Sequence, residues 1–243
     1  VGCARFIVDK TGSFPLTSAV VSDAEMLAST GLTCTLASPV TIDTLMVIDD
    51  GSVSTLVEAE GRVGPLKIVH RFRFHAGMSL VQIETTVLNP QAAEHPGGCW
   101  PLGAGGHVRF EDLSVTVLPT ERANASLTAE ADTSSFSGFS EAKLFQASSG
   151  GEQWDPHNHV DAENQLTPVF RGYRLTVDEK PLDGMRATPY ARQGSSSQGL
   201  AFGSRHFWQN FPKTLEVSRE TGIRFGLWPQ EADISHELQG GEQ

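Results

Sequence analysis

The sequence predicts an all-β protein built from two packed sheets. Apolar residues recur at every second position far more often than at helical spacing, and 24 glycines and 13 prolines interrupt the apolar runs at short intervals. Alternation with period two is typical of strands that bury one face, and glycine and proline favour turns. Helical spacing is limited to one turn around 22–29. About ten or more strands are readable, which is enough for two sheets with a common core.

The first half of the chain contains the clearest strands, at 4–8, 32–36, 45–48, 53–57, 66–74 and 81–87. Asp50-Gly51 separates the third run from the fourth, and this pair predicts a hairpin turn because both residues tolerate a positive φ. In 66–74, Ile68, His70 and Phe72 share one face. We expect this run to pair with 81–87 as a long antiparallel hairpin, since both alternate with period two.

The second half is expected to form strands at 107–118, 143–147, 169–177, 200–208 and 215–227. Alternation in 169–177 puts Arg171 on the same side as Tyr173. In 200–208 it puts His206 and Trp208 on the apolar face of Leu200 and opposite Arg205.

Composition limits the classes of partner. A chain of 243 residues with 39% hydrophobic residues can bury one substantial core, so we expect a single domain spanning 1–243. The net charge of -11 and the lack of clustered Lys and Arg argue against nucleic acid and anionic membranes as partners. There is no apolar run of about 18 residues, the length that a membrane-spanning helix needs. The three cysteines match no metal-site spacing and are interpreted as buried thiols or as one disulfide with one thiol.

Two long polar connections, 90–106 and 147–167, are expected to carry binding groups over the rigid strands. The second contains Trp154, His157, Asn158 and His159. An indole face can stack on a pyranose ring while neighbouring amide and imidazole groups bond its hydroxyls, which favours a sugar site. One alternative is a loop in which these side chains only form hydrogen bonds. Another is a metal held by the two imidazoles with Asp155 or Asp161, but no third imidazole or thiol follows at ligand spacing, so a metal centre is not predicted.

Tyr190 and Arg192 are the second candidate pair. An arginine beside a tyrosine can lower the pKa of the phenol, so that the phenolate can remove a proton in a β-elimination. An edge-strand tyrosine without a catalytic role is the alternative. The sequence shows no phosphate-binding Gly-Lys-Ser/Thr loop, no Gly-x-Ser-x-Gly elbow and no His-Glu-x-x-His motif. Glu237 and Glu242 stay open as a carboxylate pair for glycoside chemistry.

Several long motifs resemble the exo-acting rhamnogalacturonan lyase family that includes the bacterial YetA-like proteins. They are the segment 205–213, which reads Arg-His-Phe-Trp-Gln-Asn-Phe-Pro-Lys, then Leu227-Trp228-Pro229, and the final segment 236–243, His-Glu-Leu-Gln-Gly-Gly-Glu-Gln. Segments 71–89 and 96–103 agree with them, so that the resemblance covers the chain from about residue 50 onwards.

The resemblance implies a fold, an activity and partners. The fold would be a large antiparallel β-sandwich of galactose mutarotase-like, or supersandwich, type, forming the central domain of a longer chain. The activity would be that of a polysaccharide lyase, which cleaves rhamnogalacturonan I of pectin from a chain end by β-elimination. The expected partners are pectic poly- or oligosaccharide and adjacent N- and C-terminal domains of the same chain. No cofactor is indicated, and calcium is left open.

Elimination beside a uronate needs a base, a group that neutralises the carboxylate, and a proton donor for the leaving oxygen. The predicted catalytic residues are His159, Tyr190, Arg192 and Arg205. The predicted substrate-binding residues are Trp154, His157, Asn158, Arg171, Trp208 and Gln209.

Location and two alternative functions complete the expectations. The Asn124-Ala125-Ser126 sequence fits a glycosylation acceptor and, with a pectic substrate, predicts an extracellular protein whose export signal lies outside this sequence. One alternative is a non-catalytic carbohydrate-binding or bracing sandwich. The other is a mutarotase-like epimerase, which would need His159 or His206 to face a carboxylate.

Overall fold

A computed structural model describes residues 4–91, 106–131, 133, 135–150 and 169–240. The protein is all-β with several antiparallel sheets, which confirms the predicted class, and its described residues contain no α-helix. A short 3₁₀ turn, η2, covers Gln230–Ala232. None of the helical segments in this part of the chain is long and apolar enough to cross a membrane.

The chain divides into two compact units. Unit 1 consists of Val1–Glu25, Thr30–Phe110 and Ser235–Gln243, and unit 2 consists of Met26–Ser29 and Glu111–Ile234. The single domain expected from the sequence remains a prediction.

Unit 1 contains three antiparallel sheets. The first is formed by β1 (Ala4–Val8), β2 (Leu16–Val21) and β3 (Ala24–Glu25), and the second by β5 (Val40–Asp50), β6 (Ser54–Val63), β7 (Leu66–His75) and β8 (Val81–Leu88). β9 (Val108–Phe110) pairs with β20 (His236–Leu238).

The predicted hairpins of unit 1 are confirmed. β7 and β8 pair in the register that places Arg71 opposite Glu84, and Ile68, His70 and Phe72 are buried on one face of β7. β5 and β6 also form a hairpin, closed by a hydrogen bond of 3.0 Å from the Gly51 N–H to the Ser54 carbonyl. The reason given for that turn was wrong, because neither Asp50 nor Gly51 has a positive φ.

The helical turn expected around 22–29 was also wrong. Ser22 and Asp23 have φ values of 50° and 63° and form the tight turn between β2 and β3. Left-handed residues at both central positions are typical of hairpin turns and do not continue a right-handed helix.

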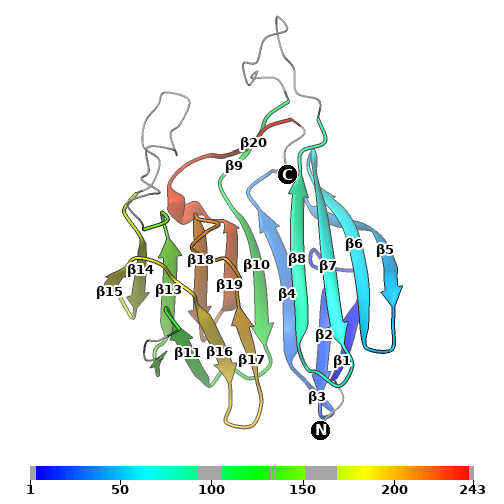
Figure 1. Cartoon of the computed structure of the whole chain (residues 1–243), viewed down its shortest axis with the longest axis horizontal. Helices are drawn as coiled ribbons and strands as arrows, with labels where there is room; N and C mark the ends of the chain where they lie inside the picture. The colour runs from blue at the N-terminus through cyan, green and yellow to red at the C-terminus, as the bar shows by residue number, and fades with distance from the viewer. Residues whose placement is uncertain (1–3, 92–105, 132, 134, 151–168, 241–243) are drawn as a thin grey trace, which may run out of the picture. The chain divides into compact units, whose positions relative to one another are not determined.

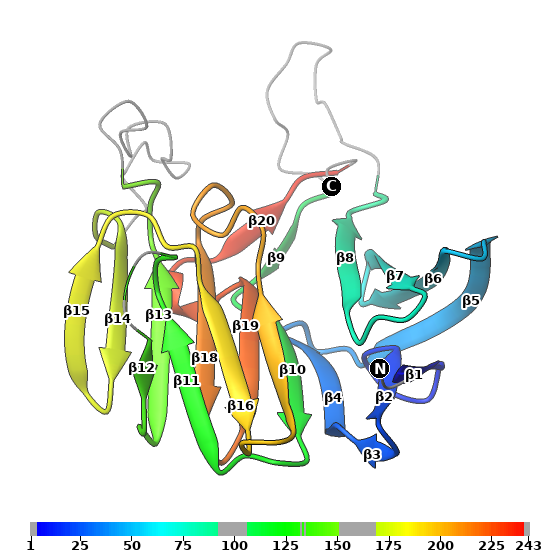
Figure 2. The same ribbon diagram turned by 60° about the horizontal axis from the view of Figure 1, so that its bottom comes forward.

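Unit 2 has a sandwich-like arrangement of two sheets, which Figure 2 shows as two layers. The larger sheet has the order β15 (Lys180–Gly184), β14 (Tyr173–Val177), β13 (Glu141–Gln146), β18 (Lys213–Ser218), β19 (Gly222–Trp228), β10 (Leu113–Pro119) and β4 (Leu27–Cys34), of which only the first residues lie in this unit. The smaller sheet has the order β12 (Phe136–Ser137), β11 (Asn124–Thr128), β16 (Tyr190–Gly194) and β17 (Gly199–Gly203).

The core of unit 2 lies between these sheets. Leu144, Leu175 and Leu215 of the larger sheet pack into one buried cluster with Leu127 and Ala191 of the smaller sheet. Each is at most 1% exposed, and burying a leucine side chain stabilises a fold by roughly 1.5–3 kcal/mol. The two inner faces therefore fix the positions of the strand ends.

The strand predicted at 200–208 ends early, at Gly203, and residues 205–210 form turns. His206 is exposed with a φ of 55°, and Phe207 is the buried residue, at 1% exposure. The predicted faces for His206 and Trp208 were therefore wrong, because a left-handed residue breaks the alternation of an extended chain. Arg171 likewise precedes β14, from which Gly172 separates it with a φ of 80°.

Candidate functional site

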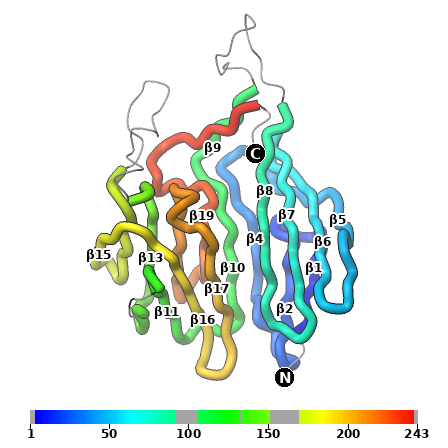
Figure 3. Tube along the Cα trace, viewed as in Figure 1, coloured from blue at the N-terminus to red at the C-terminus, as the bar shows by residue number. Residues whose placement is uncertain are grey.

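One end of the larger sheet in unit 2 gathers several of the predicted residues. β13 ends at Gln146, which is paired with Tyr173 at the start of β14 and with Lys213 at the start of β18. Residues 204–210 follow β17 at the end of that strand away from the 195–198 hairpin turn, as the traces in Figures 1 and 3 show.

Arg171 and Arg186 are both anchored at this end, on the carbonyls of two consecutive residues. The Nε of Arg186 donates to the Ser149 carbonyl at 3.2 Å, and the Nε of Arg171 donates to the Gly150 carbonyl at 3.2 Å. Both residues are exposed. Each guanidinium therefore uses its Nε for the backbone, and its terminal nitrogens make no hydrogen bond to the described residues.

Trp208 brings the 204–210 turn to the same place. The guanidinium carbon of Arg186 lies 4.4 Å from the centre of the Trp208 ring, which is half-buried. Stacking of this kind contributes about 0.5–1 kcal/mol at exposed sites and fixes the plane of the guanidinium. The structure thus places two predicted binding residues, Arg171 and Trp208, at the same end of the sheet, where Arg186 stacks on Trp208 and Arg171 binds the carbonyl next to the one that holds Arg186.

Lys213 adds a third cation. Its Nζ donates to the carbonyls of Pro212 at 3.2 Å and Leu227 at 2.5 Å, and lies 5.4 Å from the centre of the Trp228 ring. Burial lowers the pKa of the Lys213 ammonium to about 8. We refer to Arg171, Arg186, Trp208 and Lys213 as the basic sheet end.

Among the described residues, no acidic side chain neutralises the positive charge of the basic sheet end. Within the described ranges, no carboxylate forms an ion pair with Arg171, Arg186 or Lys213. The whole chain has a net charge of -11, so a cluster of cations with no carboxylate partner among the described residues is unexpected from composition. Such a cluster suits an anionic group on a ligand.

The other described candidates are placed differently. The Nη2 of Arg192 donates to the Ser195 carbonyl at 2.5 Å, in the hairpin turn at the far end of β16 from Tyr190. Tyr190 is 51% exposed, and no hydrogen bond joins it to Arg192. Arg205 and Gln209 are exposed in the 204–210 turn.

The remaining candidates, Trp154, His157, Asn158 and His159, lie outside the described residues. Their roles stay predictions. The same holds for Glu242, which was considered as a partner of Glu237.

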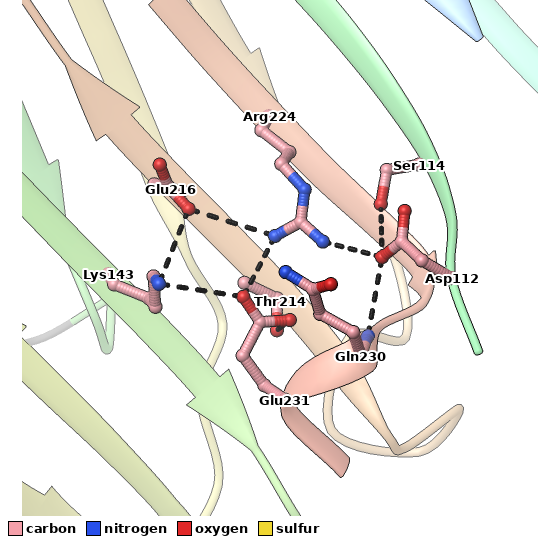
Figure 4. A network of polar contacts seen from close by, with 8 residues as sticks. All are labelled: Asp112, Ser114, Lys143, Thr214, Glu216, Arg224, Gln230 and Glu231. Carbon is pink, nitrogen blue, oxygen red and sulfur yellow. Dashed lines mark hydrogen bonds and ion pairs between the residues drawn. The ribbon is translucent and has the colours of Figure 1, made fainter. Parts of the chain in front are cut away.

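A second polar cluster, drawn in Figure 4, lies on the sheet face opposite the core of unit 2. Arg224 contacts Asp112 at 2.5 Å and Glu231 at 2.9 Å, and Lys143 lies 3.6 Å from both Glu216 and Glu231. Burial lowers the pKa of the Arg224 guanidinium, but attraction to Glu231 and Asp112 more than offsets this, and the net pKa is raised.

The second cluster fastens a segment rather than offering a site. Glu231 belongs to η2, and Asp112 also accepts a hydrogen bond of 3.3 Å from the Gln230 N–H. Burial raises the pKa of Glu231, but the attraction of Arg224 lowers it by more. The net pKa is therefore lowered, and the carboxyl group is held ionised. The carboxylates are thus occupied by cations and tie η2 to the sheet.

In unit 1, Glu237 forms a similar structural contact. It pairs with His107 and, at 2.6 Å, with the Nε of Arg109. Burial raises its pKa, but Arg109 and His107 lower it by more, so that the net pKa is lowered. A carboxyl group held ionised cannot serve as the general acid of a glycosidase. In the part of the chain that the structure describes, no group of three or more His, Cys, Asp or Glu side chains is placed to hold a metal ion.

Sequence reasoning missed Arg186 and Lys213. Arg186 sits between Met185 and Ala187, where no local pattern distinguishes it, and its contacts are with Ser149 and Trp208. The Phe-Pro-Lys motif ending at Lys213 was noticed only as part of a family resemblance.

Comparison of the chain with protein-family models, with curated proteins and with solved structures finds no match.

Proposed function

We propose that this chain is a large sandwich domain of galactose mutarotase-like type in an extracellular, exo-acting rhamnogalacturonan lyase, and that its basic sheet end binds the pectic substrate. The observation that carries the proposal is that Arg171 and Arg186 are held on consecutive carbonyls, Arg186 against the Trp208 ring, and that neither has a carboxylate partner among the described residues. The sequence motifs supply the choice of polysaccharide.

The chemistry of the substrate fits this pair. Each galacturonate residue carries one carboxylate, and β-elimination begins with removal of the proton next to it. Guanidinium groups bind carboxylates through two parallel N–H donors, and they stabilise the charge that develops when the proton leaves. Because the Nε atoms are used by the backbone, the terminal nitrogens are the donors that remain.

The residues proposed to remove the proton are chosen from the sequence. Tyr190 and His159 are the proposed bases, with Arg192 and Arg205 as further neutralising groups. Lys213 has a lowered pKa, yet two carbonyls accept hydrogen bonds from its ammonium and therefore favour the protonated form. This observation favours binding without turnover by this chain as the second candidate function.

Binding is tested by isothermal titration calorimetry with rhamnogalacturonan I oligosaccharides and with neutral galactan of the same length. We expect an Arg171→Gln and Arg186→Gln double variant to bind the acidic ligand at least about tenfold more weakly, since each hydrogen bond to a charged group contributes about 1.5–3 kcal/mol. Arg219→Gln is the matched control, because Arg219 is exposed in the turn between β18 and β19, at the other end of the same strands. Equal affinity of all three proteins would contradict the proposal.

Turnover is tested separately by the absorbance of the unsaturated product. The full-length protein is compared with His159→Ala and Tyr190→Phe. Unchanged rates in both variants would exclude His159 and Tyr190 as the catalytic base. Substrate binding would then remain as the function of this chain.

A further inference from the structure

Gln146 is a buried amide whose hydrogen-bonding groups are all engaged by the backbone. It is 0% exposed, and its Nε2 donates to the carbonyls of Ser148 at 2.5 Å and Met185 at 2.9 Å. Its Oε1 accepts from the Ala187 N–H at 2.9 Å. One side chain therefore joins the segment after β13 to the segment after β15.

These bonds enclose Arg186. Met185 and Ala187 are its two chain neighbours, so the amide of Gln146 fixes the backbone on both sides of the arginine. The guanidinium is then held by the Ser149 carbonyl and the Trp208 ring. A shift of the backbone at Arg186 would break at least one hydrogen bond to the buried amide of Gln146, which costs about 1–3 kcal/mol for the group left unsatisfied.

Ser148 plays the same part for Arg171. It is 1% exposed, and its Oγ accepts from the Gly172 N–H at 2.8 Å, next to Arg171 in the chain. The same oxygen accepts from the Gly150 N–H at 3.4 Å. The carbonyls of Ser149 and Gly150, which hold the two guanidiniums, thus belong to one segment that Gln146 and Ser148 lock.

The close packing of this segment needs glycine. Gly150 has a φ of 72°, and a Cβ there would overlap the Met185 carbonyl oxygen. Gly172 has a φ of 80°, and a Cβ there would overlap the Gly184 carbonyl oxygen. The frame around the two arginines is therefore rigid backbone with little room to adjust.

We infer that Gln146 and Ser148 are positioning residues that set the geometry of the two guanidiniums before a ligand arrives, Gln146 for Arg186 and Ser148 for Arg171. The consequence for substrate affinity rests on the proposed function, whereas the consequence for the arginines does not. A ligand carboxylate would meet donors already placed, which spares the cost of ordering two long side chains.

The test compares Gln146→Met with Gln193→Met. Gln193 is also 0% exposed in unit 2, and its Nε2 donates to the Ser218 carbonyl at 2.8 Å, near the other end of β18. Two quantities are measured: hydrogen exchange of the arginine Nε–H groups by NMR, assigned with Arg171→Lys and Arg186→Lys, and the Kd for a rhamnogalacturonan I oligosaccharide. We expect Gln146→Met to accelerate exchange at Arg186 and to raise the Kd, each by about tenfold, and Gln193→Met to change neither.

The outcomes separate this inference from the proposed function. Equal Arg186 exchange in Gln146→Met and Gln193→Met would overturn the inference, even if the wild type binds the oligosaccharide. Selective acceleration in a protein that binds no oligosaccharide would support the positioning role and contradict the proposed function. If Gln146→Met does not fold, Ser148→Ala decides: faster exchange at Arg171 than in the wild type supports the inference, and unchanged exchange overturns it.

Discussion

The buried side chain of His70 makes the stability of unit 1 depend on pH. The imidazole is 0% exposed, its Nδ1 lies 2.9 Å from the Thr85 hydroxyl, and its Nε2 has no hydrogen-bond partner among the residues that the structure describes. Phe14 packs edge-on against the ring at 5.0 Å. Burial lowers the pKa of His70 from 6.5 to about 4, because the charged imidazolium loses its hydration in the core.

The sign follows from the two pKa values. The unfolded chain takes up a proton at His70 below about pH 6.5, and the folded chain does so only below about pH 4. The stabilisation from the neutral ring is therefore complete above pH 6.5 and is lost as the pH falls towards 4. The loss begins only below pH 6.5 and amounts to about 1.4 kcal/mol per pH unit. Between pH 7 and pH 5 the free energy of unfolding therefore falls by about 2 kcal/mol.

The variant that removes this titration is His70→Gln. Hydrogen exchange of the β7 and β8 amides reports the opening free energy of unit 1 alone, and it is measured at pH 7 and pH 5 for the wild type, His70→Gln and Thr85→Val. We expect the wild type and Thr85→Val to lose about 2 kcal/mol more than His70→Gln, since Thr85→Val keeps the buried imidazole. The same loss in all three proteins would refute the assignment to His70.

Three further results are expected. Arg224→Met removes the cation that contacts Asp112 and Glu231 and should lower the unfolding free energy in urea by about 3 kcal/mol. Arg174→Met, at the exposed pair with Asp183, should cost less than about 1 kcal/mol, and equal costs would contradict the role given to the buried cluster. Gly172→Ala should destabilise unit 2 well beyond Gly138→Ala, because both glycines have a φ near 80° but a Cβ at position 138 meets nothing within 4 Å. Glu237→Gln should flatten the decline in unit 1 stability below about pH 4.5, because a carboxyl group with a lowered pKa stabilises the fold above its ordinary pKa and loses this effect as the pH falls through the folded value.

The sequence predicted strands best where one face of a strand is buried along its whole length. β7 is such a case, since Ile68, His70 and Phe72 are all buried and the alternation in the chain reflects that directly. The same reasoning was wrong for the 204–210 turn. Period two is defined only for an extended backbone, and the left-handed conformation at His206 ends it.

The candidate site was predictable in part. Arg171 and Trp208 stood out as residue types suited to an acidic sugar, but their meeting depends on Arg186 and Gln146, which contact residues 37 to 41 positions away. Only the folded arrangement of the sheets brings such segments together. Arg192 shows the opposite case, because its nearness to Tyr190 in sequence suggested a pair, while its guanidinium bonds to Ser195 in the hairpin turn.

The two crowded glycines beside the arginines have a consequence for how this chain can diverge. Substitution at Gly150 or Gly172 disturbs the backbone whether or not a ligand is ever bound, whereas Arg171 and Arg186 are exposed and can be replaced with little effect on folding. Selection for folding alone would keep the glycines and let the arginines drift. In descendants of this chain, arginines retained near those glycines would mark lineages in which the proposed binding is selected. Glycines without the arginines would mark lineages that keep the fold for another use.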